Sequence, residues 1–295
     1  MTVPKIIWML WLQGFNSAPP LVEVCIKSWE RHNPDWSLRL LTQENVREHL
    51  DAEFCDDLFS TKLPHKKIAN IIRLALIARH GGIWVDTDCF CTCPLDSWIQ
   101  EATAAGFFAF RFTESDRWLI DEKVSRYQRL LSRTDDRVLA NWFLAAAPGS
   151  YIPTHFSREH FKLLKSVSTK RKSLLGLFGK VLMNKMKRNS YLSSMTGNPE
   201  FIRKIGRYPF YVFHYHFAYL LRTDPAFRDS WVAVKPSEVK DALAFSKTLG
   251  LPVDQRFKDA MKQTIPPVYK FHSRRIVALQ EGQQTRWEWL RDDLS

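Results

Sequence analysis

Two aspartates separated by one residue, Asp86 and Asp88, have the clearest capacity for chemistry in this 295-residue chain. They belong to a β-rich run, IWVDTDCF (83–90), that predicts a strand. Side chains alternate along a strand, so both carboxylates are expected on one face, with Cα atoms roughly 6 to 7 Å apart. Two carboxylates in apolar surroundings need a positive partner, and oxygen ligands suit Mn²⁺ or Mg²⁺. A lone D-x-D is also typical of a solvated turn, but the buried context favours a metal site.

The residues before this run predict a helix that ends at Gly81 and Gly82. Apolar residues recur at helical spacing along one side of it: Ile68, Ile71, Ile72, Ala75 and Leu76. Asn70 and Arg73 share another face of the same helix. The segment 64–94 is therefore expected to be a helix, a glycine turn and a buried strand.

The rest of the chain predicts an α/β fold with a largely parallel sheet covered by helices. Strands are expected at 3–12, 37–42 and 107–112, and a strand or helix at 141–147. Helices are expected at 21–31, around 43–60 and near the end, in RWEWLRDDL (286–294). The aromatic stretch 208–220 predicts a core strand with a loop, in which His214 and His216 are core or acceptor-site residues. In such sheets ligands bind beyond the carboxyl ends of the strands, where Asp86 and Asp88 are expected.

Composition predicts one folded domain over 1–295, with no apolar run long enough to span a bilayer. The N-terminus is expected to be a core strand rather than a signal peptide. The odd count of 5 cysteines and the absence of C-x-x-C favour buried thiols in a reducing compartment, and hence a cytoplasmic protein.

The net charge of +12 is concentrated in 158–188, where 10 Lys or Arg residues accompany one acid. Their mixture with large apolar residues predicts a basic amphipathic helical insertion at about 155–192. This insertion either lies on an anionic membrane, at the inner face of the cell membrane, or is an ordinary solvated helix. Nucleic acid is not expected as a partner, because the segment has no aromatic stacking platform.

Three segments together resemble sugar transferases of glycosyltransferase family 32, and most closely the capsular-polysaccharide-synthesis branch. They are KIIWMLWLQG, NIIRLALIARHGGIWVDTD and NWFLAAAPG. The resemblance implies a GT-A fold, Mn²⁺ or Mg²⁺, a nucleotide-sugar donor and retention of anomeric configuration. UDP-sugars are favoured over GDP-sugars, and the acceptor is a glycan or lipid-linked glycan of capsule, lipopolysaccharide or another surface polysaccharide.

The resemblance also assigns roles residue by residue. It places Trp11 against the nucleotide base, Arg73 at the donor sugar or phosphates, and Asn141 near the transferred sugar. Asp86 meets the ribose and the metal, and Asp88 is the direct metal ligand. Asn70 stands where the family usually has an aspartate that binds the sugar. From the tail, His272 is the expected third metal ligand, with Lys270 and Ser273 as phosphate contacts.

Glu114 and Asp116 are expected on the acceptor side, and no carboxylate is placed as a nucleophile. The sequence leaves two other classes open: a metal-dependent phosphotransferase or nuclease, and a non-catalytic protein that binds membranes or nucleic acid. The first lacks a phosphate-binding glycine loop and a second acidic cluster. The net charge is the main evidence for the second.

Overall fold

The computed structural model describes residues 2–112, 125, 127, 137–168, 190–263, 266–272 and 284–294. Its main sheet has the order β2-β1-β3-β6-β5. The strands in chain order are β1 (Ile6–Leu10), β2 (Ser37–Leu41), β3 (Gly82–Val85), β5 (Phe107–Arg111) and β6 (Leu139–Ala146). Strands β2, β1 and β3 are parallel, β6 is antiparallel to both β3 and β5, and β5 therefore points the same way as β3. The α/β prediction is confirmed, with one reversed strand in a mostly parallel sheet.

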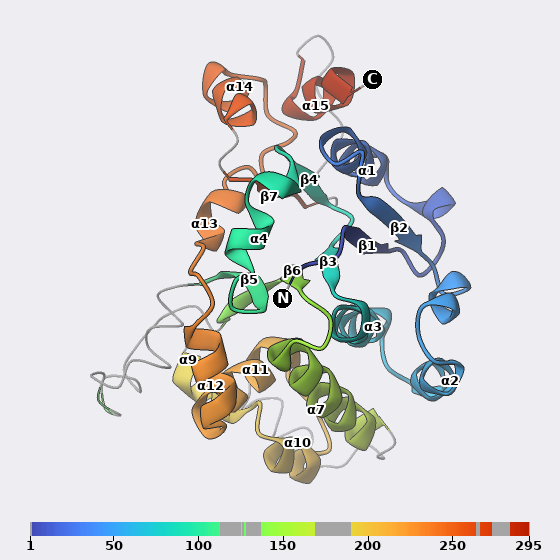
Figure 1. The fold of residues 1–295 in the computed structure, drawn as a ribbon, viewed down its shortest axis with the longest axis vertical. Helices are drawn as coiled ribbons and strands as arrows, with labels where there is room; N and C mark the ends of the chain where they lie inside the picture. Colours follow the sequence, from blue (N-terminus) through green and yellow to red (C-terminus); the bar gives the residue numbers. More distant parts are fainter. Residues whose placement is uncertain are drawn as a thin grey trace.

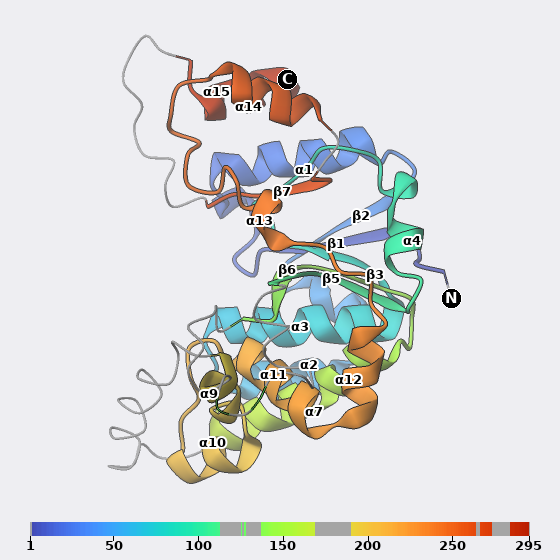
Figure 2. The same ribbon diagram turned by 90° about the vertical axis from the view of Figure 1, so that its left-hand side faces the viewer.

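Helices cover both faces of this sheet (Figures 1 and 2). On one face lie α2 (Ala52–Ser60), α3 (His65–His80), α7 (Tyr151–Ser168), α9 (Ser190–Met195), α10 (Pro199–Ile205), α11 (Val212–Thr223) and α12 (Pro225–Val232). Toward the other face and its edges lie α1 (Pro20–His32), α4 (Ile99–Ala102), α13 (Val239–Ala242), α14 (Gln255–Lys262) and α15 (Arg286–Leu294). A second, two-stranded sheet pairs β4 (Cys89–Cys91) with β7 (Val268–Lys270).

The alternation of side chains along β1 builds two separate cores. Trp8 and Leu10 face α3, α7 and α11, while Ile7 and Met9 face the opposite side with Trp29 of α1. All five cysteines are buried free thiols, as their composition predicted. No described helix is long and apolar enough to cross a membrane.

The glycine pair after α3 allows the chain to turn directly into β3. Gly81 and Gly82 both have positive φ, 66° and 83°, a region that side-chain-bearing residues rarely adopt. A Cβ at Gly82 would lie 2.6 Å from the carbonyl oxygen of Ile6, and one at Gly81 would lie 2.7 Å from that of Ala146. Each of the two positions therefore requires glycine for two reasons: its positive φ and the close approach of a neighbouring strand.

The aromatic stretch 208–220 is not a strand. Its residues from Val212 onward form α11, because Val212, Phe213, Phe217 and Leu221 follow helical spacing and are all buried. The aromatic and β-branched composition favours a strand locally, but packing against α7 and α12 determines the outcome. The predicted insertion at 155–192 lies largely outside the described residues, and its described beginning is part of α7.

Candidate active site

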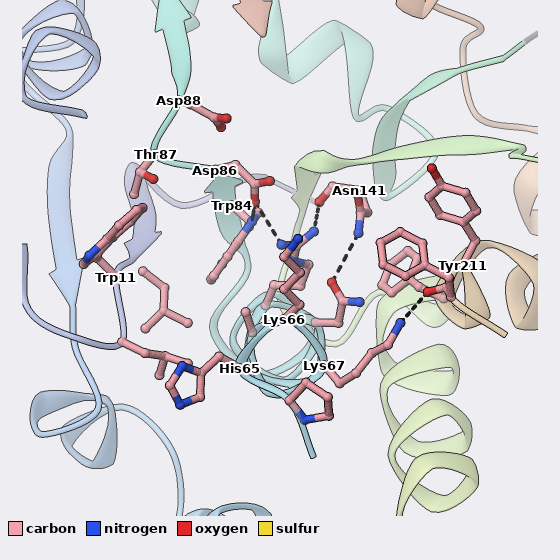
Figure 3. Close-up of a pocket in the computed structure, with 18 of the residues that line it drawn as sticks. Trp11, His65, Lys66, Lys67, Trp84, Asp86, Thr87, Asp88, Asn141 and Tyr211 are labelled. Carbon is pink, nitrogen blue, oxygen red and sulfur yellow. Dashed lines mark hydrogen bonds and ion pairs between the residues drawn. The ribbon is translucent and has the colours of Figure 1, made fainter. Parts of the chain in front are cut away.

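A cleft of about 930 Å³ lies at the edge of the main sheet where the parallel strands end. The cleft is lined by the residues following β1, the start of α3, the residues following β3, β6, the segment before α11 and the end of β7. Figure 3 shows side chains from the first five of these segments. Because β6 runs in the opposite direction, its first residues reach the edge at which β1 and β3 finish. The cleft therefore collects side chains from segments that are far apart in the sequence.

Asp86 and Asp88 lie on a turn rather than on one continuous strand. Strand β3 ends at Val85, and β4 begins only at Cys89. The amide of Asp86 still donates to the carbonyl of Trp142 on β6 (2.8 Å), and its carbonyl then accepts from the amide of Cys89 (3.0 Å). The second of these bonds closes the turn. The strand predicted over 83–90 is thus divided, and both carboxylates nevertheless line the cleft.

Asp86 is held by three side chains. Its Oδ1 accepts hydrogen bonds from Arg73 Nη2 at 2.9 Å and from Trp84 Nε1 at 3.0 Å. Its Oδ2 lies 3.3 Å from Lys270 Nζ. The guanidinium of Arg73 also lies over the Trp84 ring, 4.9 Å from its centroid. These contacts fix the carboxylate in position before any ligand binds.

Lys270 joins the two aspartates. Its ammonium group contacts Asp88 Oδ1 as well as Asp86 Oδ2, and its side chain is only 10% exposed. The antiparallel pairing of β4 with β7 places Lys270 opposite Cys89, and the amide of Phe271 donates to the carbonyl of Asp88 (2.9 Å). The pairing of β7 with β4 therefore positions the Lys270 ammonium between the two carboxylates.

Opposite charges dominate the ionisation of this cluster. Burial raises the pKa of the Asp86 carboxyl, but Arg73 and Lys270 outweigh burial and bring that pKa below its ordinary value. Burial lowers the pKa of the Lys270 ammonium, but Asp88 and Asp86 outweigh it and raise the pKa above its ordinary value. The Asp86 carboxylate and the Lys270 ammonium therefore stay charged at neutral pH.

Two asparagines lie beside this cluster. Asn141 Nδ2 donates to Asn70 Oδ1 at 3.2 Å, and the carbonyl of Asn141 accepts from Arg73 Nη1. Asn70 is 8% exposed, and both asparagines line the cleft. The structure thus brings together five of the residues predicted from sequence, namely Asn70, Arg73, Asp86, Asp88 and Asn141, with Lys270 as a sixth.

The other predicted site residues have mixed outcomes. Trp11 lines the cleft on the opposite side of Asp86 from Tyr211 (Figure 3), whereas Trp8 is a core residue. His272 is exposed and lines the cleft, with its Nδ1 2.9 Å from the carbonyl of Phe271. Ser273, Glu114 and Asp116 lie outside the described residues.

The two histidines of α11, His214 and His216, lie in different environments. His214 lines the cleft, while His216 is buried and its Nδ1 lies 3.2 Å from Nδ1 of His160 on α7. They are therefore not a pair on one strand face. On a helix, residues two positions apart point in different directions, which accounts for the difference.

The aspartate pair can accept a divalent cation. The contact of Lys270 with both carboxylates demonstrates that they converge on one positive group. Among the described residues, no group of three His, Cys, Asp or Glu side chains forms a metal site, so His272 is not placed as the third ligand. Mg²⁺ and Mn²⁺ commonly take one or two carboxylates together with substrate phosphates and water, so two aspartates fit such an ion.

Several residues that line the cleft were not predicted from the sequence. Trp84 was treated only as part of a strand, although its indole N–H holds Asp86. Lys67, Phe210 and Tyr211 line the far end of the cleft and received no role. The only signal for Lys67 was its position three residues before Asn70 on the same helix, and nothing in the sequence joins α3 to residues 208–211.

The fold and cleft define an α/β protein with a carboxylate pair at the carboxyl end of its sheet, and comparison with known sequences places it in a family. The family described as "capsular polysaccharide synthesis protein" matches residues 1–281. The chain belongs to this family, in agreement with the resemblance found in the sequence.

Two curated relatives are glycosyltransferases by name. The chain is 28% identical over 166 residues to "O-glycosyltransferase braB" of Annulohypoxylon truncatum, covering 51% of this chain and 35% of the relative. It is 26% identical over 102 residues to "Glycosyltransferase afumC" of Aspergillus fumigatus (strain CBS 144.89 / FGSC A1163 / CEA10), covering 31% and 26%. The matched region thus spans about a third or less of each of these relatives.

Solved structures give more distant likenesses. An active-site mutant of LgtC has a TM-score of 0.39 at 12% identity, covering 98% of this chain and 95% of that one. PaToxG glycosyltransferase has a TM-score of 0.35 at 12% identity, covering 78% and 75%. Neither TM-score reaches 0.5, so the fold class rests on the sheet order described above.

Proposed function

We propose that this protein is a GT-A-type, metal-dependent retaining hexosyltransferase. It moves a sugar from a nucleotide-sugar donor, a UDP-sugar in preference to a GDP-sugar, to a glycan or lipid-linked glycan acceptor. Family membership and the names of the two relatives support sugar transfer, and the family description supports a role in capsule, lipopolysaccharide or other surface polysaccharide synthesis. The observation that carries the proposal is the convergence of Asp86 and Asp88 on one cation beside Arg73.

In the proposed reaction, the bond between the sugar's anomeric carbon and the diphosphate oxygen breaks. A bond to an acceptor hydroxyl oxygen forms on the same face, and the hydroxyl proton passes to the departing diphosphate. Negative charge develops on the leaving diphosphate, and stabilising that charge is the main catalytic requirement. Mn²⁺ or Mg²⁺ held by Asp86 and Asp88 would supply a Lewis acid at the diphosphate.

The chain's own cations act on the same charge. Arg73 is rigidly held between Asp86 and the carbonyl of Asn141, so its guanidinium costs little entropy to position against a phosphate. Lys270 pairs with both aspartates in the ligand-free protein. With Asp86 and Asp88 holding a divalent cation, the Lys270 ammonium would be available to donate a charge-assisted hydrogen bond to the diphosphate.

Asn70 and Asn141 suit recognition of sugar hydroxyls, because each amide can both donate and accept. Their mutual hydrogen bond holds the two amides in a fixed relationship. An asparagine at position 70, where relatives of glycosyltransferase family 32 usually carry aspartate, is expected to alter which donor sugar is preferred. Trp11 is proposed to lie against the nucleotide base from its side of the cleft.

The proposed location is the cytoplasm, with peripheral contact to an anionic membrane through 158–188. Residues 169–189 lie outside the described part of the chain. In the described part, Lys165 pairs with Asp57 at 2.6 Å and Arg158 with Glu159 at 3.2 Å. Flotation with anionic liposomes tests this contact: neutralising Lys170, Arg171 and Lys172 is expected to weaken binding, and unchanged binding would contradict it.

A panel of nucleotide sugars tests the proposed activity. In the presence of Mn²⁺, one UDP- or GDP-sugar is expected to raise the melting temperature and to be hydrolysed slowly without an acceptor, since water can take the acceptor's place. The preferred sugar then identifies the donor. Failure of every nucleotide sugar to bind or turn over would remove the proposal. Cleavage of a nucleic acid or a simple phosphoester instead would favour the phosphotransferase or nuclease alternative.

A further inference from the structure

Two exposed aromatic rings occupy the end of the cleft opposite Trp11. Phe210 is 71% exposed and Tyr211 is 36% exposed, and both line the cleft just before α11 begins. Figure 3 places Tyr211 and Trp11 on opposite sides of Asp86 and Asn141. The rings of Phe210 and Tyr211 lie 4.9 Å apart at 81° and so form a corner of two flat surfaces. We call these two residues the aromatic corner.

The aromatic corner is attached to the helix that carries the proposed donor-binding residues. Lys67 of α3 donates from Nζ to the carbonyl of Phe210 at 2.6 Å. The same ammonium lies 5.6 Å from the ring centroids of both Tyr208 and Phe210. Burial and the neighbouring Lys66 lower the pKa of Lys67 to about 8. This partly buried contact fixes the backbone of the aromatic corner relative to Asn70 and Arg73, which follow on the same helix.

The exposure of the aromatic corner within the cleft needs an explanation, because large apolar side chains are usually buried. A large apolar ring in water forgoes the free energy of burial, and the Phe210 side chain has no polar atom that favours exposure. Burying the Lys67 ammonium costs free energy, and its hydrogen bond fixes the backbone of Phe210. This cost is more easily explained if the exposed Phe210 ring has a binding role. The cleft volume of about 930 Å³ also lies near the upper end of the range for ligand sites, roughly 300–1,000 Å³, which leaves space for a second substrate.

We propose that Phe210 and Tyr211 form the acceptor subsite and that they bind a rigid ring of the acceptor, through its flat apolar face. This inference rests on the proposed glycosyl transfer. A rigid ring fits two flat surfaces without losing conformational freedom, whereas a linear chain must be immobilised to make the same contact. Lys67 is a positioning residue, because it reaches the acceptor only through the backbone of Phe210.

The test measures binding of phenyl β-D-glucoside to the full chain loaded with UDP and Mn²⁺, by calorimetry. The Phe210→Ala variant is expected to weaken binding of this probe at least about fivefold, and Phe210→Trp to restore it, since a stacked ring contributes about 1 kcal/mol or more. Both variants should bind UDP as the wild type does. The matched control is Tyr151→Ala, which removes a 43% exposed ring from α7 outside the cleft and should change neither affinity.

The outcomes separate this inference from the function on which it rests. No binding of the phenyl glucoside to the UDP-loaded wild type, or equal affinity for it in Phe210→Ala, would overturn the acceptor subsite. Tighter binding of linear n-hexanol than of the phenyl glucoside would also overturn the preference for a ring. Failure of the wild type to bind UDP or any nucleotide sugar would instead overturn the proposed function.

Discussion

Arg73 Nη2 lies 2.9 Å from Asp86 Oδ1, so the central helix and the turn after β3 are joined by an ion pair between a buried guanidinium and a partly exposed carboxylate. The Arg73 side chain is 6% exposed and that of Asp86 is 27% exposed. The same guanidinium reaches the carbonyl of Asn141 and lies against Trp84. The guanidinium of Arg73 therefore connects α3 to β3 and β6. It holds the proposed metal-binding turn in place relative to the proposed sugar-binding asparagines.

Replacing Arg73 by lysine tests this junction. The single ammonium of lysine cannot bond to both Asp86 and the Asn141 carbonyl as the two guanidinium nitrogens do. We therefore expect kcat/KM for donor hydrolysis to fall by about 100-fold. Lysine keeps the charge but cannot reach both Asp86 and the carbonyl of Asn141, so the lost hydrogen bond should also lower the free energy of unfolding by about 1.5–3 kcal/mol. Steady-state kinetics and urea denaturation measure the two effects. Wild-type kinetics in Arg73→Lys would show that the junction has no part in catalysis.

Replacing Lys270 by methionine tests whether the Lys270 ammonium occupies the position that a divalent cation would take between Asp86 and Asp88. Without the ammonium, Asp86 and Asp88 repel each other, so the metal-free variant should melt at a lower temperature than the wild type. Mn²⁺ should then raise its melting temperature more than it raises that of the wild type, because no internal cation competes. Lys235→Met is the control, since it removes an exposed pair with Glu101. Equal Mn²⁺ shifts in Lys270→Met and wild type would contradict shared occupancy.

The sequence allowed much of this site to be predicted because its central part is local. Helix α3, the glycine turn and the two aspartates are continuous in the chain, and hydrophobic spacing alone predicts their order. The break between β3 and β4 was not predicted, since IWVDTDCF has strand composition throughout and the interruption follows from pairing with β6 and β7. The link from Lys270 to the aspartates spans 182 residues to Asp88, and no local pattern encodes it. Residues 208–220 were predicted wrongly because their packing partners in α7 and α12 outweigh local preference.

Substitution of Gly82 tests the turn that positions the aspartates. Gly82→Ala must adopt a φ of +83° and place a Cβ 2.6 Å from the Ile6 carbonyl oxygen, so we expect a loss of about 2–5 kcal/mol in unfolding free energy, from backbone strain and overpacking together. Gly149→Ala is the matched control: its φ is +71°, but a Cβ there meets nothing within 4 Å, and it should cost only about 1 kcal/mol. Chemical denaturation compares the two. Equal losses would mean that the close approach at Gly82 is unimportant.

The buried pair His160 and His216 should make the fold sensitive to acid. Burial lowers the pKa of His216 to about 3, and burial together with His216 lowers that of His160. Between the unfolded pKa of about 6.5 and the folded value, the unfolded chain binds more protons, so stability falls as pH falls, by about 1.4 kcal/mol per pH unit for each histidine. We expect His216→Gln to show a shallower decrease between pH 6.5 and 5 in denaturation experiments. An unchanged slope would assign the acid sensitivity to other groups.

Asp88 is proposed to take part in metal-dependent turnover of a nucleotide sugar, and the Asp88→Asn variant tests this role most directly. The variant retains the size of the side chain and removes its charge. With Mn²⁺ present, hydrolysis of the preferred nucleotide sugar should fall at least about 100-fold, while Asp96→Asn, at an exposed pair with Lys5 outside the cleft, keeps the wild-type rate. A wild-type rate in Asp88→Asn, with the same dependence on Mn²⁺, would contradict the account.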